Sequence, residues 1–139
     1  MREQSTGPWS VSELALIGPA AELQIAAQRP DGTLRRETPI WVVCVDGQVY
    51  VRTWHRRETG WFGHAVGSGR ARIRVPGLTA DVDVQDVGDA EADLSAGVDA
   101  AYRAKYGAGA ESMVTPAATA STLRLRVRTG PRSRGRAAR

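Results

Sequence analysis

The chain of 139 residues is poor in the side chains that build covalent or metal-linked structure. It has one cysteine, Cys44, and a single thiol forms neither an internal disulfide nor a thiolate metal site. Cys44 lies in the apolar stretch IWVVCV, where a buried strand cysteine is expected rather than a nucleophile. The two histidines, His55 and His64, do not form an HxH or HExxH motif. The sequence therefore predicts no metal site.

The chain also lacks long apolar runs. No stretch reaches the length of a transmembrane helix, and the first ten residues, MREQSTGPWS, lack the apolar core of a secretory signal. A cytoplasmic protein with no membrane partner is therefore expected. A G-x-G-x-x-G phosphate-binding motif is missing as well, because GSGR (67–70) comes before a predicted strand, as a tight turn does.

Acidic residues are missing from one end of the chain, and this explains the formal net charge of +4. The last ten residues, GPRSRGRAAR, hold four arginines and no acid, so fifteen bases remain against fifteen acids elsewhere. A neutral body gives no reason to expect specific nucleic-acid binding. The tail has no large apolar residue and is expected to be disordered. The predicted organisation is an N-terminal helical segment (1–20), one folded domain (21–129) and the Arg-rich tail (130–139).

Apolar residues that alternate with polar ones are frequent, and they are typical of β-strands. Asp46-Gly47, between two such runs, is the strongest hairpin signal in the chain. Six antiparallel strands of this length favour a small barrel, because closing the sheet removes its exposed edges. The predicted strands cover about 23–27, 33–45, 48–54, 71–75, 78–87 and 121–127.

Two or three helices are expected beside this mainly β (α+β) barrel. Ser10 and Glu13 fit a capping box, and the helix that they begin ends at Gly18. WFGHAVGSG (61–69) predicts one or two helical turns. A longer helix is expected from the cap residue Asp89 to Gly107. Its apolar stripe consists of Leu94, Val98, Ala101 and Tyr102.

Three sequence segments, together with the order of the predicted strands and helices, resemble the flavin-binding split-barrel superfamily of pyridoxamine-phosphate-oxidase-like proteins. They are TPIWVVCVDGQVYVRTW (38–54), GWF (60–62) and DAAYRAKYG (99–107), within a matching region of about 21–128. The chain looks closest to an uncharacterised bacterial branch and is similar to deazaflavin-dependent nitroreductase-like proteins of actinobacteria. The resemblance implies a six-stranded antiparallel split β-barrel that forms a homodimer.

The resemblance also implies a cofactor site between the subunits. Basic residues after the third strand would hold the phosphate of FMN or of a deazaflavin coenzyme, and arginine suits this task because its planar fork of donors matches phosphate. Two tryptophans would stack on the ring system. The implied phosphate-binding residues are Arg52, Thr53, Arg56 and Arg57, and the implied stacking residues are Trp54 and Trp61. The alternatives are a solvated basic loop for the arginines and simple barrel packing for the tryptophans.

Two residues are candidates for acid–base catalysis. His64 titrates near neutral pH, so both of its forms are available, although a surface histidine is the alternative. Glu37 is a candidate groove carboxylate, or else a cross-strand partner of an arginine. Deazaflavin-dependent relatives commonly have a Trp-Tyr pair where this chain has Trp61-Phe62, so the chain lacks that tyrosine hydroxyl.

Three functions follow from these patterns. The first is an oxidoreductase that binds a flavin or deazaflavin nucleotide and acts on a small organic molecule. The second is a cofactor-free enzyme of natural-product biosynthesis that uses the same aromatic groove to cyclise, isomerise or dehydrate a flat, polyketide-like intermediate. The third is a non-catalytic module that binds a small aromatic or polycyclic ligand.

Overall fold

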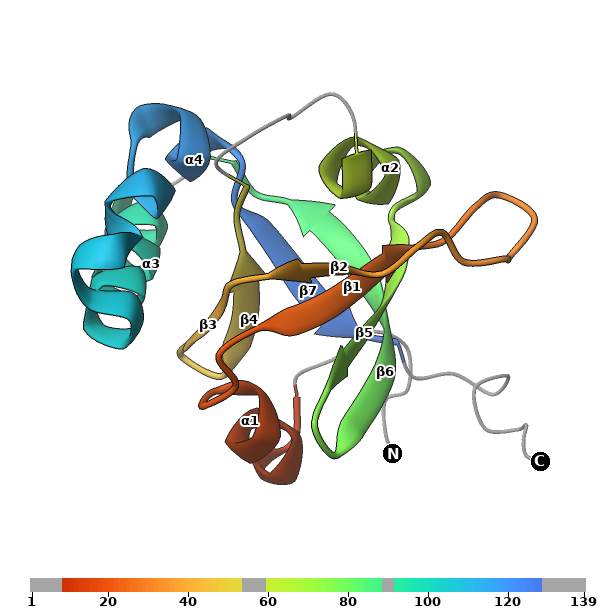
Figure 1. The fold of residues 1–139 in the computed structure, drawn as a ribbon. Coiled ribbons are helices and arrows are strands. Elements are labelled where there is room, and N and C mark those ends of the chain that lie inside the picture. Colours follow the sequence, from red (N-terminus) through yellow and green to blue (C-terminus); the bar gives the residue numbers. More distant parts are fainter. Residues whose placement is uncertain (1–8, 54–59, 89–91, 129–139) are drawn as a thin grey trace.

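A single seven-stranded antiparallel sheet forms the body of the protein. The structure is a computed structural model that describes residues 9–53, 60–88 and 92–128. In the order β2-β1-β5-β6-β7-β4-β3, the sheet curls into a nearly closed barrel with helices around it (Figure 1). The strands are β1 (Leu23–Ala27), β2 (Thr38–Ile40), β3 (Val42–Val45), β4 (Gln48–Val51), β5 (Arg70–Val75), β6 (Leu78–Asp86) and β7 (Leu123–Val127).

Helices cover the two ends and one side of the barrel (Figure 1). The first helix has the predicted capping box, in which Ser10 Oγ accepts a hydrogen bond from Glu13 N and the Glu13 carboxylate accepts one from Ser10 N. None of the described helices has the length and apolar character that crossing a bilayer requires. The helices are α1 (Val11–Ile17), α2 (Gly60–Ser68), α3 (Ala92–Tyr106), the 3₁₀ helix η1 (Gly107–Met113) and α4 (Pro116–Ala120).

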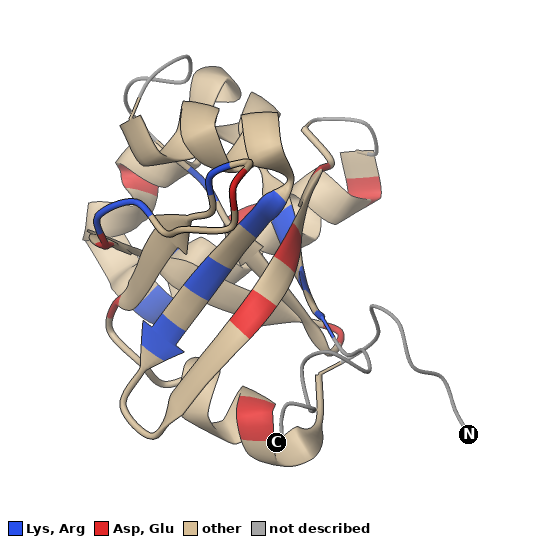
Figure 2. Ribbon diagram, turned by 90° about the vertical axis from the view of Figure 1, so that its right-hand side faces the viewer, with Lys and Arg blue, Asp and Glu red and all other residues tan. Residues whose placement is uncertain are grey.

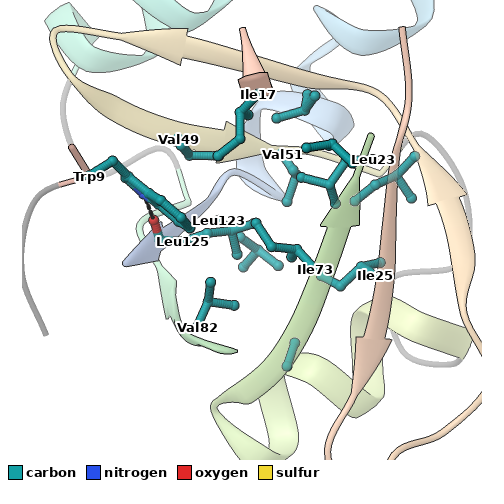
Figure 3. Packing of buried hydrophobic residues seen from close by; sticks show 14 of the residues in the cluster. Trp9, Ile17, Leu23, Ile25, Val49, Val51, Ile73, Val82, Leu123 and Leu125 are labelled. Atoms are coloured by element: carbon teal, nitrogen blue, oxygen red, sulfur yellow. Dashed lines mark hydrogen bonds between the residues drawn. The ribbon is translucent and has the colours of Figure 1, made fainter. Parts of the chain in front are cut away.

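The main hydrophobic core fills the barrel interior. It consists of the inward-facing residues of the strands together with Trp9 and Ile17 from the N-terminal segment (Figure 3). The Trp9 indole N–H donates a buried hydrogen bond of 2.9 Å to the carbonyl oxygen of Leu125. Burial of the polar atom of Trp9 is therefore compensated, and the segment before α1 is fixed to the last strand.

A second core lies outside the barrel, between the outer face of β3 and β4 and the helices α3 and η1. Val43 and Tyr50 from the strands pack there against Val98 and Tyr102 of α3. Both faces of β4 are consequently buried, since Val49 and Val51 point into the barrel while Tyr50 points under α3. The predicted apolar stripe of the long helix is thus confirmed; its predicted cap, Asp89, lies outside the described residues.

The predicted barrel is confirmed, but the expected count of six strands was one too few. The run predicted as one strand over 33–45 instead forms two short strands, β2 and β3, separated by Trp41. The Trp41 ring stacks on the Tyr106 ring of α3, with a centroid distance of 4.1 Å and an interplanar angle of 3°. At this stack the chain passes from β2, at one edge of the sheet, to β3, at the other edge.

Candidate functional site

The end of strand β4 carries a buried arginine. The side chain of Arg52 is 0% exposed, and its guanidinium forms an ion pair of 2.5 Å with Asp99 of α3. It also donates to Thr122 Oγ1 at 2.8 Å and to the Met113 carbonyl oxygen at 2.8 Å. A buried charge needs such partners, because an uncompensated guanidinium is costly away from water. Arg52 thus joins β4 to α3, η1 and the start of β7.

The next residue is fixed through its backbone. Thr53 N donates to Ser121 Oγ at 3.0 Å, and Ser121 Oγ donates to the Thr53 carbonyl oxygen at 3.0 Å. Residues 52 and 53 therefore end the strand in a rigid, fully bonded setting. The polar side chains that the structure buries among the described residues are Arg52, Thr53, Ser121 and Thr122, and all four belong to this network.

Four residues singled out in the sequence follow directly on this network. Trp54, His55, Arg56 and Arg57 lie outside the described residues, so their predicted roles stay predictions. The geometry of Arg52 favours an internal, structural role, and its predicted contact with a phosphate also stays a prediction.

Helix α2 begins at Gly60 and carries the next group of predicted site residues. Its inner side is anchored by Phe62 and Ala65, which are buried against the barrel. Trp61 is half-buried and meets the Phe62 ring edge to face at a centroid distance of 5.6 Å. His64 is exposed and lies one helical turn after Trp61, so the two share one side of the helix. An aromatic plane and a titratable imidazole are therefore neighbours on this surface.

Glu37 lies apart from this pair, on the outer face of the barrel. Its carboxylate accepts hydrogen bonds of 3.0 and 2.6 Å from the guanidinium of Arg74. This is the predicted alternative of a cross-strand arginine partner. The hydrogen bonds from Arg74 hold the pKa of Glu37 below its ordinary value, so the carboxylate is ionised at neutral pH and is unsuited to donating a proton.

The outer face of β5, β6 and β7 carries a ladder of charged side chains (Figure 2). Arg72 pairs with Asp81 at 2.7 Å, whereas Asp83 pairs with Arg128 at 3.4 Å. Cross-strand register places Arg70 and Arg126 on either side of Asp83. The Arg126 Nε atom is buried and, within the described part of the chain, finds no hydrogen-bond partner.

No pattern in the sequence singled out Arg126 as a site residue. Alternation alone identifies the face on which an arginine lies, but not whether its donors are satisfied. An orphaned guanidinium donor is unusual, since buried polar groups are normally paired, and it suits an anionic group such as a phosphate. The described residues hold no cluster of three or more His, Cys, Asp or Glu side chains that could bind a metal.

These residues fit a flavin-type nucleotide in part. Trp61 offers a ring for stacking, His64 offers an imidazole for proton transfer, and Arg126 has a buried Nε atom without a partner among the described residues. Arg52 is fully engaged within the protein. The other predicted phosphate-binding arginines, Arg56 and Arg57, lie outside the described residues.

The fold is shared with several solved structures at low sequence identity. A protein of unknown function from Agrobacterium tumefaciens has a TM-score of 0.57 and 16% identity over 82% of this chain and 50% of its own. A conserved hypothetical protein from Mycobacterium tuberculosis has a TM-score of 0.56 and 14% identity, over 93% and 84%. An FAD-binding protein from Mesorhizobium loti has a TM-score of 0.53 and 14% identity, over 90% and 93%. The predicted split-barrel resemblance is thereby confirmed at the level of the fold.

Sequence comparison gives one match. A family model described as "Uncharacterized protein conserved in bacteria (DUF2255)" matches residues 13–125. No curated protein matches the chain.

Proposed function

The chain belongs to the bacterial family DUF2255, and because its fold is also that of flavin-binding split barrels, we propose that it binds a flavin-type nucleotide, FMN or a deazaflavin coenzyme, and reduces or oxidises a small organic molecule. The observation that carries the proposal is the fold shared with an FAD-binding protein over nearly the full length of both chains. When bound, such a cofactor supplies the hydride chemistry, while the protein supplies position and electrostatics.

In this proposal the protein presents its binding residues from a rigid frame. The Arg52–Asp99 ion pair and the Thr53–Ser121 clasp fix the chain before residue 54, and the buried Phe62 fixes it after residue 59. Arg56 and Arg57 then bind the phosphate, and Trp54 and Trp61 stack on the ring system.

His64 is proposed as the proton donor or acceptor. It lies one turn from Trp61, and its exposed imidazole can give or take a proton. Phe62 has no hydroxyl, so among α2 side chains His64 is the one suited to moving a proton at neutral pH. Glu37 would act only as a base in this scheme, and Arg74 would have to release it first.

We further propose a cytoplasmic homodimer with the ligand groove between two copies. The fold relationship supports this assembly. Sedimentation or light scattering of the purified protein tests it directly, and a monomer at all concentrations would contradict it.

The first test is the absorbance spectrum of the purified protein, followed by titrations with FMN, FAD and the deazaflavin coenzyme. Replacing Arg56 and Arg57 by alanine should weaken binding at least about tenfold, because each charge-assisted contact with a phosphate contributes roughly 1.5–3 kcal/mol. The matched control is Arg70→Ala/Arg72→Ala, which removes the same charge from the barrel face. Equal losses in both double variants would mean that nonspecific charge explains the binding.

A cofactor-free enzyme is the second candidate, and two observations favour it. The Arg52 guanidinium is turned inward, and Phe62 lacks the hydroxyl of the deazaflavin-dependent relatives. A colourless protein that binds none of the three cofactors but transforms a flat polycyclic intermediate would support this candidate. Binding of such a compound without turnover would instead support the non-catalytic module.

A further inference from the structure

A pocket lies between the end of α1, strand β3 and helix α3. It has a volume of about 360 Å³ and is lined by Gly18, Val43, Cys44, Ala101, Ala104 and Lys105. Gly18 caps the end of α1, Val43 and Cys44 come from β3, and the other three come from the C-terminal half of α3. Three independent elements thus form its walls, and none of its residues belongs to the candidate site described above.

The walls of this pocket are apolar except at Lys105 and Cys44. Lys105 is the single lysine of the chain, since the other eighteen of its nineteen basic residues are arginines. Its Nζ atom donates one hydrogen bond of 2.6 Å to the Val42 carbonyl oxygen and lies 5.1 Å from the centre of the Tyr106 ring. An ammonium has three donors, so two of them remain for another partner.

No acidic side chain balances this charge. Among the described residues, ion pairs form at five arginines, and none includes Lys105. Burial lowers the pKa of Lys105, which indicates that the ammonium is partly desolvated and would gain from a negative partner. The pocket is therefore complementary to one negative charge attached to an apolar body.

The frame around Lys105 is held in place by its neighbours. The Tyr106 hydroxyl donates to the Ala21 carbonyl oxygen at 2.8 Å and accepts from Val42 N at 3.1 Å, while its ring stacks on Trp41. These contacts tie the end of α3 to β3 and to the segment after α1. Lys105 is thus presented on a fixed wall, which reduces the entropy that a ligand would have to offset.

We propose that this pocket binds a small organic monoanion, such as a short-chain carboxylate, with its carboxylate on Lys105 and its apolar chain against Val43, Ala101 and Ala104. The binding step forms a charge-assisted hydrogen bond and involves no covalent change. The proposal is independent of the flavin-type cofactor, because it uses no residue of α2 or of the segment before it.

The single thiol of the chain offers a direct readout. Cys44 is partly exposed within the pocket, so a ligand that occupies the pocket should shield it from iodoacetamide. We would follow alkylation of the intact protein by mass spectrometry, with hexanoate as the probe and hexanamide as its uncharged match, at constant ionic strength. About 10 mM hexanoate should slow alkylation several-fold, since one charge-assisted contact and a short apolar chain suggest a millimolar dissociation constant.

Variants separate the charge from the shape of the pocket. Lys105→Met keeps the apolar stem and should weaken protection by hexanoate about tenfold, whereas Lys105→Arg keeps the charge and should retain it. Ala104→Leu narrows the pocket and should abolish protection, while Ala96→Leu, at an exposed position of the same helix about two turns away, should leave it unchanged. For each variant, the rate of Cys44 alkylation with hexanoate or hexanamide is compared with the rate of the same variant without either compound.

The proposal is overturned if hexanoate does not slow alkylation, if hexanamide protects as well as hexanoate, or if protection persists in Lys105→Met. Thermal melting of each variant shows whether it is folded, and should Lys105→Met fail to fold, the comparison of Ala104→Leu with Ala96→Leu decides. Loss of flavin binding elsewhere would not alter any of these outcomes.

Discussion

At the scale of single residues, the buried arginine directly after β4 holds several elements together. Arg52 links a strand to α3, η1 and β7 through one guanidinium. Replacing Arg52 by methionine should lower the free energy of unfolding by about 3–5 kcal/mol, because it leaves Asp99 and two buried acceptors without their donor. Urea denaturation measures this loss.

The matched control for this substitution is Arg72→Met. Arg72 also pairs with an aspartate, but both side chains are more than a third exposed. An exposed pair contributes roughly 0–1 kcal/mol, so the control should change stability little. Similar losses for both variants would contradict a special role for Arg52.

Tyr102 makes stability sensitive to alkaline pH. Its side chain projects from α3 onto the outer face of β3 and β4, and burial there raises its pKa above the ordinary value of 10.0. A raised pKa in the folded state means that Tyr102 contributes full stability below pH 10 and loses that contribution as the pH rises further. Between about pH 9 and pH 11, Tyr102→Phe should therefore lose less stability than the unmodified protein. Denaturation at a series of pH values tests this, and parallel curves would refute it.

The contacts of single residues were the part that sequence reasoning could predict least. Alternation correctly separates Tyr50 and Arg52 from Val49 and Val51, but it does not show what covers the face of the first pair. The structure covers that face with α3, whose residues come more than forty positions later. Local periodicity carries no information about which later element covers a strand, so the Arg52–Asp99 pair has no signal in the sequence.

At the scale of elements, the β3–β4 hairpin depends on two residues with positive φ. Asp46 has φ 52° and Gly47 has φ 77°, which is the backbone of a two-residue hairpin turn. Gly47→Ala should destabilise the protein by about 1–2 kcal/mol, because a Cβ atom disfavours the left-handed region. Thermal denaturation checks this value.

Gly67 in α2 provides the opposite case. It has helical backbone, and a Cβ atom there would meet no other atom within 4 Å. Gly67→Ala should stabilise the protein by up to about 1 kcal/mol, since alanine has the higher helix propensity. If Gly47→Ala and Gly67→Ala both destabilise the protein, the backbone conformation of each glycine does not explain the effect of its substitution.

Elements were easier to predict than contacts where capping or turn residues mark their ends. Ser10 with Glu13, Asp46-Gly47 and Gly107 mark boundaries that the structure confirms. The apolar run 33–45 has no such mark inside it, and its division at Trp41 arises from stacking on Tyr106, a residue of the distant helix α3. A boundary set by tertiary packing leaves no local signal.

At the scale of the whole molecule, stability rests on the barrel interior. Leu125 is fully buried in it, and Leu125→Ala should lower the free energy of unfolding by about 2–5 kcal/mol through lost contacts and a residual cavity. Val11→Ala is the control, because its side chain is 86% exposed. Chemical denaturation followed by tryptophan fluorescence should show one transition for both variants. A small effect at Leu125 would mean that the interior repacks freely.

The position of β7 has a consequence for synthesis of the protein. This strand, which the ribosome makes last among the seven, lies in the middle of the sheet, between β6 and β4. A nascent chain that stops before Leu123 leaves the edges of β4 and β6 without their partner and Trp9 without Leu125. The barrel can therefore close only after residues up to about 127 have left the exit tunnel. Such late, long-range pairing is typical of slow folding, so the growing chain exposes its unpaired edges until β7 has emerged, and chaperones have most to protect in that interval.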